Sequence, residues 1–472
     1  MRTLFLNPPS FKGFDGSAGS RYQACREVRS FWYPTWLAYP AGMIKEARLL
    51  DASAEGMTRE EVIREASGYQ LVIIHTGTPT FKNDAALADA LKDEHPHLTI
   101  GMVGPHVTVS PEESLRSSPA LDFVAIGEFD DTVVESAEGL PLDTVRGIVF
   151  RSNGTTHRTP ARPLIEDLDR LAFVTDVYAR DLRVENYFIG YLKHPYVSLY
   201  GGRGCRGRCT YCLWPQTIGS GTYRVRSPKN IIGELSRARE LFPQAKEFFF
   251  DDDTFTDHPG LKEIAEGIGA LGITWSCNAR ANVPKDTLEM LKSSGLRLLV
   301  VGFESGNQSI LNNIRKGISL EGARRFSQAA REAGILVHGT FILGLPGETR
   351  ETMEETMRFA REIDPYSLQV SLAAPYPGTA LYDEAKREGW LVGEGDGLVC
   401  EGIQNSVLAY PWLSKEEIFA AVEVFYRRFY LRPAPILRIL KEMLRDRDEF
   451  SRRIREGREF FSFMAKRKAM TV

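Results

Sequence analysis

Short apolar runs alternate with longer amphipathic stretches through the first 130 residues of the chain. The runs RTLFLN, LVIIHTG, LTIGMVG and DFVAIG are separated by helical stretches such as FKNDAALADALKDEHP. This alternation is typical of parallel strands joined by crossover helices. It predicts an α/β fold whose N-terminal part is a doubly wound parallel sheet of the flavodoxin or Rossmann type.

The same rhythm begins again near Tyr196 and repeats six times. The runs YVSLY, EFFFDD, TWSCNA, LRLLVVGFES, VHGTFILGL and SLQVSLAAP are each followed by a helical stretch. Six strand–helix units predict a partial (βα)6 TIM-type barrel, whose site residues gather at the carboxyl ends of the strands. We therefore expect a sheet domain over 1–150, a linker over 151–194, the barrel over 195–385 and a helical, basic segment over 386–472.

Composition narrows the class of protein. The 472 residues are 43% apolar and 26% charged, which is an ordinary globular balance in a chain too long for one small domain. The N-terminus MRTLFLNPPS lacks the apolar region of a signal peptide, and no run approaches the roughly 20 apolar residues of a membrane span. We expect a cytoplasmic protein with no transmembrane segment and no nucleic acid partner.

Charge is distributed unevenly along the chain. Residues 425–472 hold fourteen Lys and Arg against six Asp and Glu, so this segment carries +8 and the remainder −11, for a net charge of −3. The stretch FYRRFYLRPAPILRILKEML suits a peripheral contact with an anionic membrane or an amphiphilic substrate. The alternative interpretation is a helical cap with a solvated face.

Three of the six cysteines lie in one glycine-rich loop. In GGRGCRGRCTYCLWPQ, three and then two residues separate Cys205, Cys209 and Cys212. A zinc ion or a four-iron cube normally takes four protein ligands, and this loop supplies three. A cube held by three thiolates keeps one iron open for chemistry, whereas the alternative is a zinc knuckle with a distant fourth ligand.

The other three cysteines do not suggest a disulfide framework. A cytosolic chain keeps its thiols reduced, and six cysteines in a 53.0 kDa protein are too few for a secreted scaffold. We interpret Cys25, Cys277 and Cys400 as free thiols of the core.

The pattern C-x3-C-x2-C, with Tyr211 before the last cysteine, resembles the signature of the radical S-adenosylmethionine (SAM) superfamily. The resemblance implies a [4Fe-4S] cluster on Cys205, Cys209 and Cys212 that binds SAM and cleaves it reductively to methionine and a 5′-deoxyadenosyl radical. It also implies an electron donor of the flavodoxin or ferredoxin type. No acid–base residue can be assigned from the sequence.

The family resemblance also implies a SAM site at the strand ends. The segments FFFDDDTF, WSCNARANV, VGFESGNQSIL, GTFILGLPGET and APYPGT match family segments in the same order. Arg280 and Glu304 suit the carboxylate and the ribose hydroxyls of SAM, and a structural salt bridge is their alternative role. The SAM residues implied in this way are Asp251, Asp252, Asp253, Arg280, Glu304, Gly344, Glu348, Pro375 and Tyr376.

Small and hydroxyl residues follow the first four predicted strands, where a large flat ligand can approach the sheet. Ordinary loop residues are the alternative. With the loops VGPHVTVSPEE and AIGEFDDTV, the domain resembles the cobalamin-binding domain of cobalamin-dependent radical SAM enzymes. It lacks the D-x-H-x-x-G motif, so we expect base-off cobalamin without a histidine ligand. The implied cobalamin residues are Asn7, Pro8, Thr76, Gly77, Thr78, Thr80, Gly104, His106, Val107, Gly127 and Glu128.

A closer resemblance concerns the substrate. FLNPPSFKGFDGSAGSRYQ, RSFWYPTWLAYPAG, CLWPQTIGSGTYRVRSP and FYRRFYLRP resemble the radical SAM enzymes of hopanoid biosynthesis that form the cyclitol ether headgroup. This implies ring contraction of a hopanoid-linked glucosamine, an amphiphilic, lipid-like substrate.

Two alternatives to ring contraction remain. The first is a cobalamin-dependent radical SAM C-methyltransferase acting on an unactivated carbon, which consumes a second SAM and yields S-adenosylhomocysteine. The second is a non-catalytic cobalamin or iron–sulfur sensor, in which the aromatic segment Phe31, Trp32, Tyr33 and Trp36 serves a partner. Core packing is the other expected fate of these rings.

Overall fold

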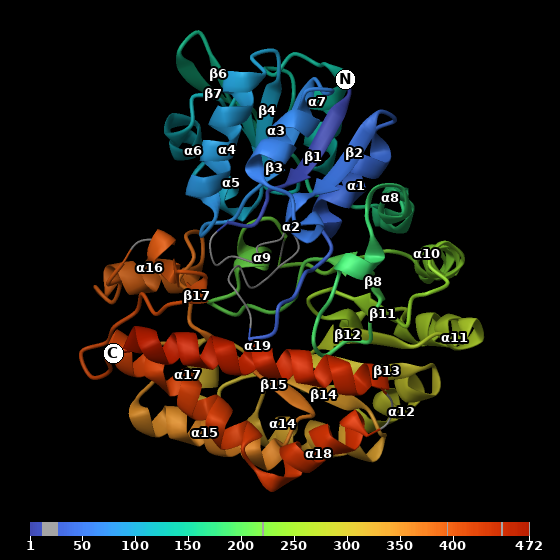
Figure 1. Ribbon diagram of the computed structural model, residues 1–472, viewed down its shortest axis with the longest axis vertical. Coiled ribbons are helices and arrows are strands. Elements are labelled where there is room, and N and C mark those ends of the chain that lie inside the picture. The colour runs from blue at the N-terminus through green and yellow to red at the C-terminus, as the bar shows by residue number, and fades with distance from the viewer. Residues whose placement is uncertain (12–26, 220, 394, 445–446, 472) are drawn as a thin grey trace.

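Two largely parallel sheets, one in each half of the chain, organise the protein (Figure 1). The computed structural model describes residues 1–11, 27–219, 221–393, 395–444 and 447–471. Cys25 lies outside the described residues. The N-terminal sheet domain forms one end of the molecule, and the barrel with the C-terminal helices forms the other.

The N-terminal sheet has seven strands in the order β2-β1-β3-β4-β5-β6-β7. Its first five strands run parallel in the flavodoxin-like order 2-1-3-4-5, which confirms the predicted fold class. The predicted strands are β1 (Thr3–Asn7), β3 (Leu71–His75), β4 (Thr99–Val103) and β5 (Phe123–Ala125).

Three strands of this sheet were missed in the sequence: β2 (Ala47–Asp51) and the antiparallel pair β6 (Ile148–Ser152) and β7 (Thr155–Arg158). All four residues of β7 are exposed, so this strand has no apolar alternation to detect. The sheet itself extends beyond residue 150, while the domain boundaries stay a prediction.

Both faces of the sheet are covered by helices, as its side-chain alternation requires. In β1, Leu4 and Leu6 pack into one apolar cluster and Phe5 into the other. The Phe5 side carries α1 (Thr35–Met43) and α7 (Asp130–Glu138), and the other side carries α3 (Arg59–Ala66), α4 (Phe81–Glu94) and α6 (Pro111–Ser117). Short helices α2 (Ala52–Glu55) and α5 (Pro105–Val109) follow β2 and β4.

The second sheet contains the six predicted strands, all parallel, in the order β15-β14-β13-β12-β11-β8. This arrangement confirms the partial barrel. Its strands are β8 (Tyr196–Leu199), β11 (Glu247–Phe250), β12 (Trp275–Ala279), β13 (Leu296–Glu304), β14 (Leu336–Leu343) and β15 (Ser367–Leu372). The connecting helices are α10 (Pro228–Leu241), α11 (Leu261–Leu271), α12 (Lys285–Ser293), α13 (Gln308–Asn313), α14 (Leu320–Glu332) and α15 (Arg350–Ile363).

Smaller elements complete the barrel domain. Helix α8 (Val174–Asp181) precedes β8 and packs on α1 and α10. The loop after β8 contains β9 (Gly202–Arg203), α9 (Leu213–Gln216) and β10 (Arg224–Val225). After β15 come α16 (Ala380–Arg387) and the short pair β16 (Val399–Cys400) and β17 (Ile403–Gln404).

The C-terminal helices are α17 (Lys415–Tyr430), α18 (Pro433–Met443) and α19 (Arg447–Thr471). Helix α17 covers the open edge of the barrel, where the Tyr430 and Tyr426 hydroxyls accept hydrogen bonds from the amides of Leu368 and Val370, both at 2.9 Å. These bonds satisfy groups that an edge strand otherwise leaves unpaired. The FYRRFY segment thus serves as the cap of the barrel. Within the described residues, no helix is long and apolar enough to cross a membrane.

Candidate active site at the carboxyl ends of the barrel strands

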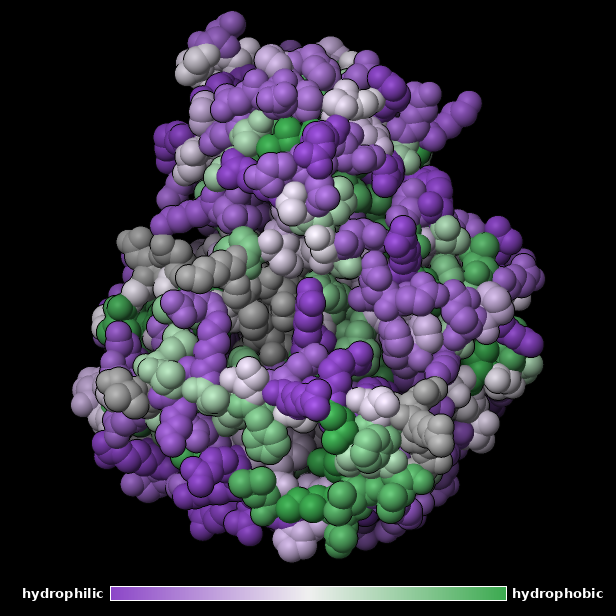
Figure 2. Space-filling view, in the orientation of Figure 1, coloured by the Kyte–Doolittle hydropathy of each residue, from purple (hydrophilic) through white to green (hydrophobic). Residues whose placement is uncertain are grey.

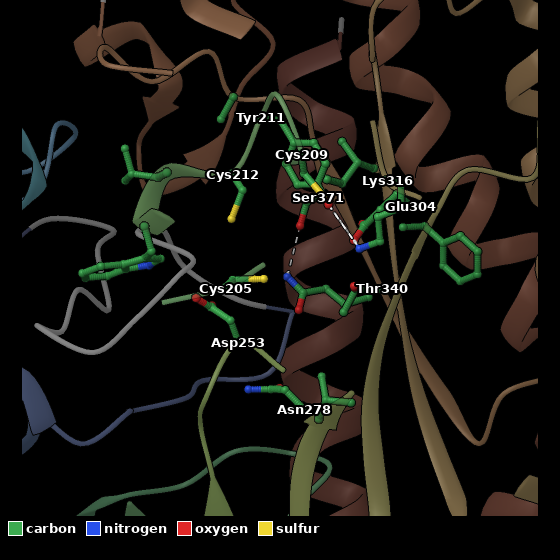
Figure 3. Close-up of a pocket in the computed structure, with 18 of the residues that line it drawn as sticks. Cys205, Cys209, Tyr211, Cys212, Asp253, Asn278, Glu304, Lys316, Thr340 and Ser371 are labelled. Atoms are coloured by element: carbon green, nitrogen blue, oxygen red, sulfur yellow. Dashed lines mark hydrogen bonds and ion pairs between the residues drawn. The ribbon is translucent and has the colours of Figure 1, made fainter. Parts of the chain in front are cut away.

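A cavity of about 310 Å³ opens at the carboxyl ends of the barrel strands. Figure 3 shows side chains from several strands and loops converging on it. Of the residues predicted from the sequence, those that line the cavity are Cys205, Cys209, Cys212, Asp251, Asp253, Arg280, Glu304 and Tyr376. The structure therefore brings the cysteine loop and the ends of β11, β12, β13 and β15 to one place.

Hydrogen bonds shape the cysteine loop. The Gln216 side-chain amide donates to the carbonyls of Cys209, Thr210 and Cys212 at 3.3, 3.2 and 2.7 Å. Thr210 is held from two further sides, because its amide donates to the Ile314 carbonyl at 3.1 Å and its carbonyl accepts from the Leu381 amide at 2.9 Å. The loop is thus tied both to the segment after α13 and to α16. Sequence reasoning missed Gln216, since a glutamine after a helical turn carries no distinctive signal.

The three thiols face the same space (Figure 3). A Cβ atom at Gly207 would lie 3.2 Å from the Cys205 Sγ and 3.8 Å from the Cys209 Sγ, so glycine leaves that space clear. Within the described residues, no three His, Cys, Asp or Glu side chains are arranged for a single metal ion. Three thiols lining one cavity match the three-ligand [4Fe-4S] cluster better than a zinc knuckle, which needs four protein ligands.

The remaining described cysteines differ from each other. Cys277 is buried, as expected, and burial raises the pKa of its thiol well above the usual value. Cys400 is exposed, so its assignment to the core was wrong. It lies in the short strand β16, which pairs only with β17 in a two-stranded ribbon and leaves its side chain outside.

The three consecutive aspartates separate in the structure. Asp251 and Asp253 line the cavity, and Asn278 donates to the Asp251 carboxylate at 3.1 Å. Asp252 points elsewhere: it accepts hydrogen bonds from the Gly201 amide at 2.7 Å and the Tyr223 hydroxyl at 2.8 Å. Burial raises the pKa of Asp252 to about 7. The structure thus gives Asp252 a framework position and leaves two aspartates at the site.

Glu304 ends β13 in an unusual conformation. Its φ of 65° is in the left-handed region, which costs a non-glycine residue free energy and is found preferentially at functional sites. The carboxylate accepts hydrogen bonds from the Lys316 ammonium at 2.6 Å and the Tyr211 hydroxyl at 2.9 Å. Tyr211 lies between Cys209 and Cys212 in the sequence, so this contact connects Glu304 to the cysteine loop.

Lys316 contacts both Glu304 and Arg280. Burial alone would lower the pKa of Lys316, but the adjacent Glu304 carboxylate outweighs it and raises the pKa, which keeps the ammonium charged. Arg280 donates to the Lys316 carbonyl at 2.7 Å. The predicted salt-bridge alternative is therefore realised for Glu304, with Lys316 as its partner. The sequence NIRKG around Lys316 offered no signal for this role.

Besides Asp252, three predicted SAM residues are absent from the cavity lining. Glu348 is fully buried and accepts hydrogen bonds from the amides of Gly344 and Leu345, the latter at 3.2 Å. Burial raises the pKa of Glu348 to about 8. Gly344 adopts a φ of 84° in the same turn, and Pro375 is buried beside the lining residues Ala374 and Tyr376. The GLPGE turn is thus a support for the end of β14.

The aromatic segment before α1 is buried, which confirms core packing. Phe31, Trp32, Tyr33 and Trp36 are each at most 7% exposed, so they cannot form a surface for a partner. Trp32 also lines the cavity. Trp36 stacks on Trp214 of the cysteine loop with ring centroids 5.6 Å apart, so the segment connects the sheet domain to the cluster site.

The predicted cobalamin residues other than Glu128 fall into two groups. Gly77, Thr78 and Thr80 lie in the loop after β3, and His106 lies at the start of α5 after β4, with the Thr78 hydroxyl 3.4 Å from His106 Nδ1. Burial lowers the pKa of His106 to about 4, so its ring is neutral. Within this group of loops, Gly104 has a φ of 123° and lies against the Thr76 carbonyl.

The other cobalamin candidates have partners within the sheet domain. Asn7 is buried and donates to Asp51 at 2.6 Å, and the Thr76 hydroxyl donates to Asp84 at 2.8 Å. Val107 is fully buried in an apolar cluster. The Pro8 carbonyl accepts from Ser53 at 2.6 Å, and the Gly127 amide donates to Thr108 at 3.0 Å. For Asn7 and Val107, burial within the domain argues against direct contact with a ligand.

Glu128 belongs to a buried ion cluster between the domains. Arg203, just before the cysteine loop, donates to Glu128 at 3.1 Å and to both Asp130 oxygens at 2.7 and 2.9 Å. Arg224 donates to Glu128 at 2.9 Å. Burial alone would lower the pKa of Arg203, but the two carboxylates outweigh it and raise the pKa. The cluster fastens the loop after β5 to the strand that leads into the cysteine loop.

A second contact joins the domains near the predicted SAM site. A Cβ at Gly378 would lie 2.4 Å from the Val109 side chain, so the loop after β15 closely approaches helix α5. The carboxyl ends of β4 and β5 therefore face the carboxyl ends of the barrel strands. A flat cofactor held by the sheet domain would lie toward the cluster cavity, which is the arrangement that two cooperating cofactors require.

Comparison with known proteins agrees with this geometry. Residues 24–137 match the B12 binding domain, and residues 199–360 match the radical SAM superfamily. An uncharacterized methyltransferase of Pyrococcus horikoshii is 29% identical over 426 residues, covering 87% of this chain and 90% of that protein. The anaerobic magnesium-protoporphyrin IX monomethyl ester cyclase of Rubrivivax gelatinosus is 25% identical over 467 residues, covering 92% and 78%. The cytidylyl-2-hydroxyethylphosphonate methyltransferase of Streptomyces wedmorensis is 26% identical over 476 residues, covering 85% and 86%.

Solved structures share the fold. The enzyme OxsB with aqua-cobalamin and SAM bound superposes with a TM-score of 0.69 at 15% identity, covering 99% of this chain and 71% of that one. The methyltransferase TsrM from Kitasatospora setae gives 0.64 at 16%, covering 84% and 78%.

The two domain matches and the converging thiols define a cobalamin-dependent radical SAM enzyme. Its cofactors are a [4Fe-4S] cluster, SAM and cobalamin. An enzyme of this class needs a reductant, and the flavodoxin or ferredoxin type of donor stays a prediction. Because the protein is an enzyme, we reject the alternative of a non-catalytic cobalamin or iron–sulfur sensor.

Proposed function

We propose that the protein is a cobalamin-dependent radical SAM C-methyltransferase that modifies an unactivated carbon. The observation that carries this proposal is the near full-length similarity to methyltransferases, above all the 29% identity over 90% of the Pyrococcus protein. Ring contraction of a hopanoid-linked glucosamine stays a prediction, since it rests on the sequence resemblance alone.

We assign the cluster to Cys205, Cys209 and Cys212. When bound, the cofactors supply reductive cleavage of SAM and methyl transfer. The polar side chains around the thiols would hold SAM: Asp253 and Asn278 lie on one side of the cavity and Glu304 on another (Figure 3). Lys316 and Tyr211 fix the Glu304 carboxylate, so this acceptor is oriented before SAM arrives.

The uncharged residues of the cavity lining indicate the class of substrate. Trp32, Tyr191, Thr340, Ile342 and Gln369 contribute aromatic, apolar and neutral polar surface to the cavity. None of these five side chains carries a charge. This part of the cavity suits an uncharged carbon skeleton, and the aromatic rings exclude water from the carbon to be methylated.

An experiment that needs no knowledge of the substrate tests the proposal. The enzyme is reconstituted anaerobically with iron, sulfide and cobalamin, reduced, and given SAM with a deuterated methyl group. A methyltransferase should yield S-adenosylhomocysteine and labelled methylcobalamin, both detectable by mass spectrometry. Formation of 5′-deoxyadenosine with neither of these products would contradict methyl transfer and favour a rearrangement.

A further inference from the structure

Helix α18 turns its polar side inward and its apolar side outward. On the inner side, Arg438 donates to the Pro365 carbonyl at 3.1 Å, and the Glu442 carboxylate accepts from Tyr366 and Arg453. The outer side bears Ile436, Leu437, Leu440 and Leu444, which are 41, 64, 48 and 86% exposed. Residues at this spacing lie on one face of a helix. A cap with a solvated face would have the opposite orientation.

The apolar face of α18 is part of a larger patch. In Figure 2, apolar side chains gather in a band along the lower edge of the molecule, over α18. Helix α19 packs on α18 and exposes Phe450 and Ile454 near its start, at 49 and 37%. An exposed apolar band of this kind marks an interaction surface.

The charge around the patch indicates what covers it. Lys441 is exposed on α18, and Arg455 and Arg458 are exposed on the first half of α19. Arg432, Arg438 and Arg453 are instead ion-paired with Asp364 and Glu442. Near α18, Lys193, Lys292, Arg297, Arg452 and Glu442 line a second cavity of about 520 Å³ at the amino ends of the barrel strands. Two copies of the chain packed through α18 would bring the exposed cations beside the two apolar faces together. An anionic bilayer instead satisfies both the apolar face and the charge.

We propose that α18 docks the enzyme on an anionic lipid bilayer, with the helix lying in the plane of the headgroups. The contact is peripheral, because the described chain has no helix that could span a membrane. Docking does not depend on the proposed methyl transfer. It places the basic second cavity beside the headgroups, while the cofactor cavity lies at the opposite ends of the barrel strands.

Flotation of the reconstituted holoenzyme with vesicles tests the proposal. The enzyme should float with phosphatidylcholine vesicles containing phosphatidylglycerol and much less with phosphatidylcholine alone. The double variant Leu437→Gln, Leu440→Gln should bind roughly tenfold more weakly or worse, because each change removes an exposed apolar side chain from the face. Val392→Gln is the matched control, since Val392 is 47% exposed outside this face; it should bind normally. All variants should cleave SAM as the wild type does.

Several outcomes would overturn docking on a bilayer. Failure of the wild type to bind anionic vesicles is one, and equal binding by the double variant is another. A concentration-dependent dimer that the double variant abolishes would assign the face to a second copy of the chain. If the double variant fails to fold by circular dichroism, Leu444→Gln replaces it, because a side chain 86% exposed makes little contribution to folding.

Discussion

At the scale of single residues, the cluster assignment is the most direct to test. Replacing Cys205, Cys209 or Cys212 by Ala should remove the cluster and abolish 5′-deoxyadenosine formation, because each thiol would supply one of only three protein bonds to iron. Iron content and product analysis give the result. Cys400→Ala, at an exposed thiol, should behave as the wild type. Retained SAM cleavage in any of the three variants would refute the assignment.

Glu304→Gln should weaken SAM binding about tenfold or more while iron content stays normal. It should also lower the free energy of unfolding by about 3 kcal/mol, because the nearly buried Lys316 loses its carboxylate partner. Equilibrium dialysis with SAM and urea unfolding measure the two effects. Glu332→Gln removes the exposed partner of Lys285 and is the control, with no measurable change expected in either quantity. Unchanged SAM binding in Glu304→Gln would assign Glu304 to structure alone.

Glu348 should make stability depend on pH. Its pKa rises from an ordinary 4.5 to about 8 in the fold, so the folded state keeps a proton that the unfolded chain has released. Stability from this residue is complete below pH 4.5 and is lost as the pH rises through 8, by about 1.4 kcal/mol per unit of pKa shift. Glu348→Gln should therefore gain stability relative to the wild type between pH 5 and pH 9. The KM of this variant for SAM should stay unchanged. A large increase in KM would instead support the original prediction that Glu348 binds SAM.

Residues could be singled out where chemistry requires a fixed spacing in sequence, although their role as cluster ligands stays a prediction. The three cysteines could be found because a short loop must place all three thiols. Asp252 and Glu348 could not be separated from true lining residues, because side-chain direction in a loop depends on partners such as Tyr223 that only the fold brings near. Lys316 was missed for the same reason.

At the scale of elements, the junction of β4 and α5 depends on one glycine. A Cβ at Gly104 would lie 2.1 Å from the Thr76 carbonyl oxygen, and its φ of 123° is unfavourable for other residues. Gly104→Ala should lower the free energy of unfolding by about 3 kcal/mol or more. Gly139→Ala is the control: its φ is 84° with nothing within 4 Å, so only about 1 kcal/mol is expected. Chemical unfolding of both variants measures the difference, and equal losses would contradict the close approach.

The strands were predictable where apolar residues form a long continuous run, and β2 was missed although Leu49 and Leu50 are buried on opposite faces. All six barrel strands follow from runs of apolar residues, whereas β7, with every residue exposed, left no pattern. The role of the FYRRFY segment could not be predicted. Its tyrosine hydroxyls accept hydrogen bonds from the edge strand β15, and the sequence does not show which strand a tyrosine side chain will contact.

At the scale of the whole molecule, Arg203 fastens the two domains. Arg203→Met should leave Asp130 as an uncompensated buried charge, while Glu128 keeps Arg224, and should cost about 3 to 5 kcal/mol. Cobalamin retention should fall while the cluster stays, because the loop after β5 loses its anchor. Thermal unfolding and cofactor content after gel filtration report both effects. Arg203→Lys should recover part of the loss, and Arg170→Gln, at a surface pair, should change little. Loss of iron together with cobalamin would contradict a selective role.

The relative placement of the domains could not be predicted. Arg203 lies 75 and 73 residues from its two partners, and a single sequence does not show such pairings. The fold of each domain follows from local pattern, but their contact depends on pairings between distant residues, such as the buried charges around Arg203 and the stacked rings of Trp36 and Trp214.

The Gln216 amide and backbone groups of Thr210, Ile314 and Leu381 shape the cysteine loop without using a thiol, while one further bond, from the Gly207 amide at 3.3 Å, ends on the Cys205 sulfur. Most of the bonds that hold the loop therefore do not depend on bound iron. We expect protein that has lost its cluster to oxygen to take up iron and sulfide again without refolding.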